Sequence, residues 1–311
     1  MKTTAQAAAT PKTPPIYQVA LIIRPDSPQL SSACLEIIAT FERAGIGVYV
    51  EEMSARALQI PRKFVRSIDE ILHSAQALVS LGGDGTLISA VHKSIGSGLP
   101  VFGINMGRLG FLTAIKPEEL SDFIPLLLQG DYILDSHRLL EGMICSKNMA
   151  NDDFASLDFA QKPATPFYAL NEIFITKKDI SGMLRIHAKV EGKPFNTYRV
   201  DGLIIATPTG SSAYNISAGG SVVHPTCQVM LLTPVCAHSL TQRPMVLSDD
   251  MVLAFEVGED AMIMLDGQDR IEFGIDDMLV VRKSLNVQLI QHPKRDYFAV
   301  LEEKFSWGGC K

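Results

Sequence analysis

Short apolar runs alternate with stretches of helical periodicity over the first half of the chain, beginning at Ile16. The run "QVALIIR" reads as a strand, and Cys34, Ile37, Ile38 and Phe41 follow at i, i+3, i+4 and i+7, the spacing of an amphipathic helix. The apolar runs "AGIGVYVEE", "ALVSL" and "LPVFGINM" continue the pattern, with helical stretches between them. This alternation predicts a mostly parallel sheet that is covered by helices.

The apolar period changes from 3.6 to 2 in the second half. In "MLRIHAKVEG", apolar Leu184, Ile186 and Ala188 alternate with polar Arg185 and His187, and "MVLAFEVG" and "NVQLIQH" show similar alternation. We therefore expect an α/β fold class, with an N-terminal parallel-sheet α/β domain followed by a β-rich, sandwich-like C-terminal domain.

The expected organisation has four parts. Residues 1–15 are rich in Ala, Thr and Pro and are predicted to form a disordered tail. The α/β domain then covers residues 16–135, and the β-rich domain covers residues 136–291. Residues 292–311 form a terminal segment that is predicted to pack back on the N-terminal domain.

Composition argues against several classes of partner. The chain of 311 residues has a net charge of −6 and a pI near 5.7, without a basic patch, so neither nucleic acid nor a membrane is an expected partner. The five cysteines are scattered and include no C-x-x-C pair, which is typical of reduced thiols. The N-terminus lacks the apolar core of a signal peptide, so a cytoplasmic location is expected.

Residues 79–91 read "VSLGGDGTLISAV", a strand that ends in a glycine turn before a new helical pattern. Glycines bring backbone N–H groups close to an anion, and a helix that follows adds its positive N-terminus, so this turn is a candidate phosphate site. It is not a P-loop, and the third glycine of a G-x-G-x-x-G motif would fall on Ile88. A simple tight turn is the alternative.

Asp84 is the unexpected residue of this turn, because phosphates repel a carboxylate. One hypothesis is that Asp84 accepts a proton from a hydroxyl nucleophile. The alternative is a helix N-cap, although Thr86 is also a capping candidate. Because Asn caps helices as well as Asp does, Asp84→Asn is expected to cost little stability.

A second candidate site covers residues 198–220, "YRVDGLIIATPTGSSAYNISAGG". The apolar run "LIIA" leads into a turn rich in proline and hydroxyl groups, and "SSAYNISA" reads as a short helix that ends at Gly219 and Gly220. Hydroxyls and free N–H groups at a helix start suit a ribose, an adenine edge or a phosphate. A capped helix without a ligand is the alternative.

Six motifs together resemble the bacterial NAD kinase family, and they occur in the order of that family. They are "GGDGT", "GINMGRLGFLT", "ALNEIFI", "DGLIIATPTGSSAYNISAGG", "HSLTQRPMVL" and "LDGQ". The resemblance covers nearly the whole chain from Ile16 to "KFSWGG". Diacylglycerol and sphingosine kinases share "GGDGT", whereas "NE" and the serine-rich motif separate this family from them.

The resemblance implies an enzyme that transfers the terminal phosphoryl group of ATP to the 2′-hydroxyl of the adenosine ribose of NAD, which gives NADP. Asp84 would be the catalytic proton acceptor, and Phe111 is a candidate wall of the pocket or a core residue. An arginine at position 199 implies a preference for NAD over NADH. The residues implied to contact the dinucleotide are Asp84, Gly85, Asn171, Glu172, Arg199, Asp201, Ser212, Ala213, Tyr214, Asn215, Ile216, Ser217 and Gln268.

ATP and NAD would be the substrates, with a divalent cation, Mg²⁺, carried by the nucleotide, because no carboxylate cluster resembles a protein metal site. The resemblance also implies a homo-oligomer, with a tetramer favoured. Two alternatives remain, namely a lipid or sphingoid kinase with the same glycine turn and a non-catalytic NAD(P)-binding regulator.

Overall fold

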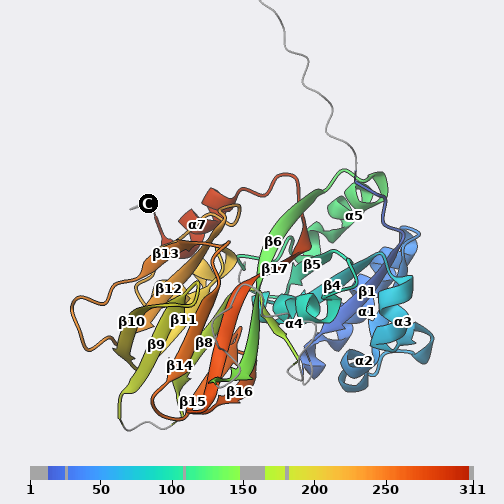
Figure 1. Cartoon of the computed structure of the whole chain (residues 1–311). Coiled ribbons are helices and arrows are strands. Elements are labelled where there is room, and N and C mark those ends of the chain that lie inside the picture. The colour runs from blue at the N-terminus through green and yellow to red at the C-terminus, as the bar shows by residue number, and fades with distance from the viewer. Residues whose placement is uncertain (1–12, 25–26, 108–109, 148–164, 179–181, 308–311) are drawn as a thin grey trace, which may run out of the picture. The chain divides into compact units, whose positions relative to one another are not determined.

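The computed structural model describes residues 13–24, 27–107, 110–147, 165–178 and 182–307. The chain divides into two units (Figure 1). Unit 1 comprises Met1–Asp135 and Gln288–Lys311, and unit 2 comprises Ser136–Val287. Among the described residues, no helix has both the length and the apolar character needed to cross a membrane.

Unit 1 contains a parallel sheet in the order β3-β2-β1-β4-β5. Leu289, near the end of β17, extends this sheet by pairing parallel with Val101 of β5. The strand order reverses between β1 and β4, and in open α/β sheets ligands bind at the carboxyl ends of the strands at such a point. The strands are β1 (Gln18–Ile23), β2 (Gly47–Glu51), β3 (Val65–Arg66), β4 (Ala77–Gly82), β5 (Val101–Asn105) and β17 (Asp277–Gln291).

Helices connect these strands, as the alternating pattern predicts. The predicted helices around Ile37, Ile68 and Val91 are confirmed, whereas α2 was not predicted. The Glu51 side chain caps α2 by accepting the Ser54 N–H, and it also pairs with Lys93 at 2.9 Å. The helices are α1 (Ser31–Arg43), α2 (Glu52–Leu58), α3 (Ile68–Ser74), α4 (Asp84–Ser94), α5 (Leu120–Gln129) and α7 (Tyr297–Phe305), with 3₁₀ turns at Pro28–Leu30, Arg62–Phe64 and Pro117–Glu119.

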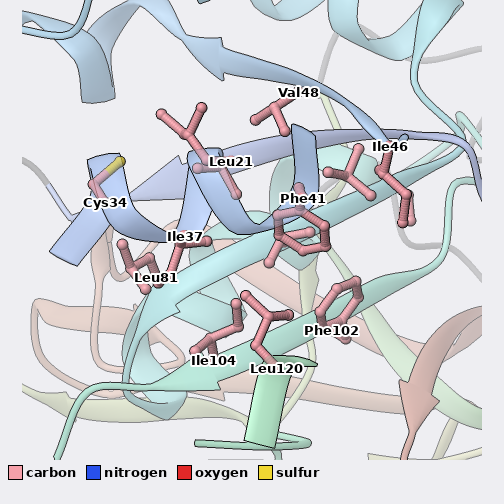
Figure 2. Packing of buried hydrophobic residues seen from close by; sticks show 14 of the residues in the cluster. Leu21, Cys34, Ile37, Phe41, Ile46, Val48, Leu81, Phe102, Ile104 and Leu120 are labelled. Atoms are coloured by element: carbon pink, nitrogen blue, oxygen red, sulfur yellow. The ribbon is translucent and has the colours of Figure 1, made fainter. Parts of the chain in front are cut away.

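The largest core cluster of unit 1 lies on one face of its sheet. Figure 2 shows Ile37 and Phe41 of α1 gathered with Leu21 of β1, Phe102 of β5 and Leu120 of α5. These side chains are nearly or completely buried, and burial of each large apolar side chain contributes about 1.5–3 kcal/mol. Helices α1 and α5 are therefore attached to the sheet through one continuous apolar cluster.

Helix α4 packs on β4 and β5. Gly103 of β5 marks the close approach, because a Cβ there would lie 3.0 Å from Leu87 Cδ1 and 2.7 Å from Thr113 Cγ2. Ala20 and Ile22 of β1 are buried although neither belongs to the cluster of α1 and α5. Both faces of the parallel sheet are thus covered, as predicted.

Unit 2 consists of antiparallel sheets. One has the order β13-β12-β11-β8-β15-β16; the other contains β10-β9-β14-β17, with β6 paired to β17 and β7. The strands are β6 (Ile133–Ser146), β7 (Phe167–Ala169), β8 (Glu172–Lys177), β9 (Leu184–Val190), β10 (Lys193–Val200), β11 (Gly202–Ala206), β12 (Val229–Val235), β13 (Met245–Ser248), β14 (Leu253–Val257), β15 (Ala261–Leu265) and β16 (Asp269–Phe273).

The inner faces of these two sheets share one hydrophobic cluster. Ile175 of β8 and Leu203 of β11 belong to it together with Ile186 of β9 and Phe255 of β14. In β9 the buried residues alternate with exposed ones, which confirms the predicted two-residue period. The unit is therefore a β-sandwich, and the predicted fold class is correct.

The predicted tail needs a correction at its end. Residues 1–12 lie outside the described residues, but Thr13 donates from its N–H and its hydroxyl to Gly130 O, at 3.2 and 2.7 Å. Tyr132 Oη donates to Pro14 O at 2.7 Å. Residues 13–15 are consequently part of unit 1, because these backbone groups have partners on the body of the unit.

We expect a chain that starts at Thr13 to be more stable than one that starts at Ile16. The shorter chain loses the bonds from Thr13 and Pro14, and each hydrogen bond contributes about 1 kcal/mol. Urea unfolding of the two truncated chains, followed by a signal that reports on unit 1, measures the difference in the free energy of unfolding. Equal free energies of unfolding would contradict the contribution of residues 13–15.

Candidate functional site

The glycine turn lies at the carboxyl end of β4, beside the point where the strand order reverses. Helix α4 begins there with Asp84, and Gly83 is its N-cap residue. Gly82 is needed because a Cβ would lie 2.3 Å from Thr86 Oγ1. The parallel sheet therefore positions the turn and the N-terminus of α4 where α/β proteins bind ligands.

The carboxylate of Asp84 accepts three backbone hydrogen bonds from a distant loop. Oδ2 accepts the N–H of Phe111 at 2.7 Å, and Oδ1 accepts those of Leu112 and Thr113 at 3.1 and 3.3 Å. A Cβ on Gly110 would lie 2.0 Å from Oδ1, so this loop approaches Asp84 as closely as a glycine permits. Asp84 is thus connected to the loop of residues 110–113.

The remaining backbone groups of residues 110–113 also have side-chain partners. Arg295 donates to the carbonyls of Gly110, Phe111 and Thr113, and Gln291 Nε2 donates to Leu112 O at 3.2 Å. The Gly110 N–H donates to Thr113 Oγ1 at 3.3 Å. Every backbone N–H and C=O of this loop is therefore paired with a side chain.

The N-cap interpretation of Asp84 is wrong. Asp84 is the first residue of α4, and the N-cap residue Gly83 has no side chain. The Asp84 carboxylate accepts N–H groups from residues 111–113 instead of α4 N–H groups. The reason for expecting Asp84→Asn to cost little stability, helix capping, therefore does not apply.

Gly85 is the second residue of α4 and is exposed. Among the described residues, a Cβ on Gly85 or on Gly83 would meet nothing within 4 Å. Packing against the described residues therefore does not require glycine at either position. The predicted contact of Gly85 with a dinucleotide stays a prediction, and glycine would permit such a close approach to the backbone.

In unit 2, Asp266 forms the turn between β15 and β16. Asp266 and Gly267 have φ of 50° and 68°, and the Gln268 N–H donates to Leu265 O at 2.8 Å, so a turn with two left-handed central residues lies within the three-residue connection between Leu265 and Asp269. The Asp266 carboxylate accepts the N–H groups of Leu170, Asn171 and Glu172 at 2.8, 2.7 and 3.0 Å. Gln268 therefore lies in the same turn as Asp266, whose carboxylate orders the start of β8.

Glu172, at the start of β8, is only 6% exposed. Burial raises the pKa of Glu172 to about 8, with a further increase from the negative charge of Asp266, and the Tyr214 backbone N–H opposes these effects. Oε2 has no hydrogen-bond partner among the described residues. A neutral carboxyl at this position offers an O–H donor as well as an acceptor.

The serine-rich turn comprises a 3₁₀ turn, Thr209–Ser212, and the short helix α6, Tyr214–Ser217. It contacts residue 171 closely, since a Cβ on Gly210 would lie 2.0 Å from Asn171 O. The Thr207 N–H donates to Asn171 O at 2.9 Å, and Thr207 Oγ1 donates to Leu170 O at 2.6 Å. The predicted residues Asn171 and Glu172 and the serine-rich turn thus lie together.

Asn215 has a structural role in this turn. Its side chain is fully buried, Nδ2 donates to Ser211 O and Ser221 O at 3.1 and 3.0 Å, and Oδ1 accepts from Thr233 Oγ1 at 2.6 Å. The predicted contact of Asn215 with a dinucleotide stays a prediction.

The other predicted residues of the turn are more accessible than Asn215. Tyr214 is 42% exposed, and its ring packs edge-on against Phe174 at 5.2 Å between ring centroids. The Ser212 hydroxyl donates to Thr209 O at 3.3 Å. Ser217 is exposed, whereas Ala213 and Ile216 are half-buried. These residues are available for the predicted contacts.

Arg199 and Asp201 lie at the opposite end of the sheet strands from Glu172. Glu172 pairs with Ala206 of β11, whereas Asp201 precedes the first residue of that strand, so about 17 Å of extended chain separates Asp201 from Ala206. Lys177 donates to Asp201 at 2.9 Å and lowers the pKa of Asp201. Arg199 is exposed. The structure therefore divides the predicted residues of unit 2 into two groups.

Sequence reasoning missed several residues that order these sites. Arg295 and Gln291 contact the loop beside Asp84, and Asp266 and Thr207 order residues 170–172. Only Asp266 had a sequence signal, because Asp-Gly between two strand patterns is typical of a hairpin turn. The described residues contain no group of three or more His, Cys, Asp or Glu side chains that fits a metal ion.

Comparisons with known proteins connect both units to one family. Residues 19–132 match the family model described as the ATP-NAD kinase N-terminal domain, and residues 170–291 match the ATP-NAD kinase C-terminal domain. An NAD kinase of Helicobacter hepaticus is 46% identical over 94% of this chain and 97% of that protein. An NAD kinase of Wolinella succinogenes is 44% identical over 94% of this chain and 96% of that protein. The chain belongs to the ATP-NAD kinase family.

Solved structures agree with this fold. The yeast NADH kinase complexed with NADH superposes with a TM-score of 0.82 at 21% identity, over 96% of this chain and 89% of that chain. An NAD kinase from Archaeoglobus fulgidus in complex with ATP superposes with a TM-score of 0.69 at 25% identity, over 94% and 100% of the two chains. The fold of this chain is thus that of NAD kinases.

We predict that Asp84→Asn lowers the free energy of unfolding by about 1–3 kcal/mol, because an amide NH₂ then faces a backbone N–H that the carboxylate had paired. Asp296→Asn is the matched control, since Asp296 caps α7 by accepting the Phe298 N–H and Asn caps equally well. Urea unfolding compares both variants with the parent chain. An Asp84→Asn variant as stable as Asp296→Asn would contradict the three-bond geometry.

We predict that Glu172→Gln becomes relatively more stable than the parent as pH rises. Between the ordinary value of 4.5 and about 8, folded Glu172 keeps a proton that the unfolded chain has released, so the parent loses stability with rising pH. The difference grows by at most ~1.4 kcal/mol per pH unit. Urea unfolding over this pH range measures the effect, and parallel pH curves for the two proteins would exclude a raised pKa.

Proposed function

We propose that this chain is an NAD kinase, which transfers the terminal phosphoryl group of ATP to the 2′-hydroxyl of the adenosine ribose of NAD. The observation that carries the proposal is the family match across both units, together with Asp84 at the carboxyl end of β4. The relatives with 44–46% identity carry the name NAD kinase. Asp84 is the proton acceptor in this proposal.

The hydrogen bonds of Asp84 fit that role. A carboxylate has about four acceptor positions, and three of them accept N–H groups from residues 111–113. In the proposed reaction, the fourth acceptor position of Asp84 accepts a hydrogen bond from the ribose hydroxyl. The same position then accepts the proton of that hydroxyl. The fixed carboxylate provides the near-attack geometry on which phosphoryl transfer depends.

The exposed backbone at Gly85 and the start of α4 would contact the dinucleotide or its phosphates through N–H groups. The Mg²⁺ ion would be carried by the triphosphate, where it neutralises charge, because the described residues do not offer a cluster suited to hold it alone. The chain's own residues then bind and orient the two substrates.

In unit 2, Asn171, Glu172, Gln268 and the serine-rich turn would hydrogen-bond the dinucleotide. The buried Oε2 of Glu172 supports this role, because a ligand donor would satisfy an oxygen that has no partner among the described residues. A neutral Glu172 would also donate to a ligand oxygen. Arg199 and Asp201 are proposed to contact a dinucleotide at the other end of the strands.

A cytoplasmic homo-oligomer, with a tetramer favoured, completes the proposal. Its support is the separation of Arg199 and Asp201 from Glu172 along the strands, which is consistent with two groups that serve different binding sites. Sedimentation equilibrium of the full chain measures the state. A fully active monomer would contradict this part of the proposal.

We predict that the purified chain, given ATP and Mg²⁺, forms NADP from NAD, phosphorylates NADH much less efficiently, and leaves diacylglycerol unchanged. Asp84→Asn should lower kcat at least ~10²-fold, since general-base assistance contributes about 10² to 10⁴ in rate. A coupled assay for NADP and a lipid extraction assay measure the products. Phosphorylated lipid would identify a lipid kinase, and NAD binding without turnover would identify a regulator.

We predict that Gly85→Ala keeps or raises the free energy of unfolding, because Ala favours a helix over Gly by about 0.5–1 kcal/mol and its Cβ would meet none of the described residues within 4 Å. If a ligand approaches this backbone, kcat/KM should fall at least ~10-fold, which is about 1.4 kcal/mol. Gly210→Ala is the contrasting control, with an expected loss of stability against Asn171 O. An unchanged kcat/KM in Gly85→Ala would exclude the close approach.

A further inference from the structure

We propose that Arg295 is a positioning residue for Asp84, and that it acts through the backbone of residues 110–113. The inference rests on the proposed function, because it concerns the geometry of the proposed proton acceptor. Arg295 follows β17 and precedes α7, at a position that no predicted site includes.

The guanidinium of Arg295 contacts three carbonyls of one loop. Nη2 donates to Phe111 O at 2.6 Å and to Gly110 O at 3.4 Å, and Nη1 donates to Thr113 O. The N–H groups of the same loop donate to Asp84. The loop is therefore bound by Asp84 through its N–H groups and by Arg295 through its carbonyls.

Arginine is suited to this position by its geometry and its charge. A planar guanidinium presents five donors in a fixed fork, whereas a lysine ammonium is a point donor on a flexible stem. Removal from water lowers the pKa of Arg295, and the negative charges of Asp84 and Asp135 oppose that decrease. The guanidinium remains protonated and so attracts the Asp84 carboxylate as well as the loop carbonyls.

Helix α7 reinforces the same loop. The ring of Phe305 packs against Phe111 at 5.6 Å between centroids, and Trp307 packs on Phe305 at 5.0 Å. Lys304 Nζ lies 5.8 Å from the centre of the Phe111 ring. Because the backbone of Phe111 also bonds to Asp84 and Arg295, both its ring and its backbone have fixed contacts.

Arg295 also lines a cavity of about 430 Å³ together with Lys294, Asp296, Ala299 and Glu303. If the Arg295 side chain is shortened, a guanidinium ion from solution can enter this cavity and reach the position of the lost side-chain group. Lys294 is exposed and makes none of the loop contacts. It is therefore the matched control for loss of one positive charge.

Loss of the Arg295 fork leaves three loop carbonyls without their donor, so the loop and the bound Asp84 carboxylate lose their fixed position. A misplacement of about 1 Å at a reacting group reduces the rate by about 10². We expect Arg295→Ala to lower kcat by about 10- to 10²-fold. The KM for NAD should change little, because Arg295 touches the loop rather than a substrate.

The test compares Arg295→Ala, Arg295→Lys and Lys294→Ala in the full chain. Steady-state kinetics with NAD give kcat and KM, and guanidinium below unfolding concentrations is added to each protein, with sodium at equal ionic strength as the reference. We expect guanidinium to raise kcat of Arg295→Ala only, and Arg295→Lys to recover part of kcat. Lys294→Ala should keep the parent values.

Amide hydrogen exchange of residues 111–113, measured by mass spectrometry, tests the loop contact independently of kinase activity. Exchange should accelerate in Arg295→Ala and slow again with guanidinium. If the parent chain lacks kinase activity but the exchange result holds, the proposed function fails and the loop contact stands. A parent-like kcat in Arg295→Ala, unchanged exchange, or a kcat loss that guanidinium does not reverse would each overturn the proposal.

Discussion

The site in unit 1 depends on a loop whose backbone is paired only with side chains. In residues 110–113, Asp84 accepts three N–H groups while Arg295 and Gln291 donate to the carbonyls. Buried backbone groups need partners, and here no helix or strand supplies them. The position of the Asp84 carboxylate and the conformation of the loop are consequently determined together, and the proposed catalysis depends on both.

Unit 2 orders its candidate binding residues in the same way. Asp266 accepts the N–H groups of residues 170–172, as Asp84 accepts those of residues 111–113. In both units a single carboxylate orients three consecutive peptide groups beside candidate ligand-binding residues, and charge-assisted hydrogen bonds of this type are strong. The negative charge of Asp266 also helps to keep Glu172 neutral, since it adds to the effect of burial.

The fold could be predicted from the sequence because the patterns that indicate helices and strands involve residues close together in the chain. The two apolar periods identified the parallel sheet and the antiparallel strands, and "GGDGT" located Asp84 at a strand end. The partners of Asp84 could not be predicted, because they lie 27–29 residues away in the chain and the motif that contains them does not indicate that their N–H groups reach Asp84. Arg295 is 182–185 residues from its loop partners, and its role follows only from the folded contacts.

A double-mutant cycle of Asp84→Ala and Arg295→Ala, measured by urea unfolding, tests most directly whether these side chains stabilise one loop. Once Asp84 is removed the loop is already released, so the second substitution should cost less than it does alone. We expect a coupling free energy of at least ~0.5 kcal/mol, the range found for residues that share partners. Two losses that add to within about 0.3 kcal/mol would show independent roles and contradict the account.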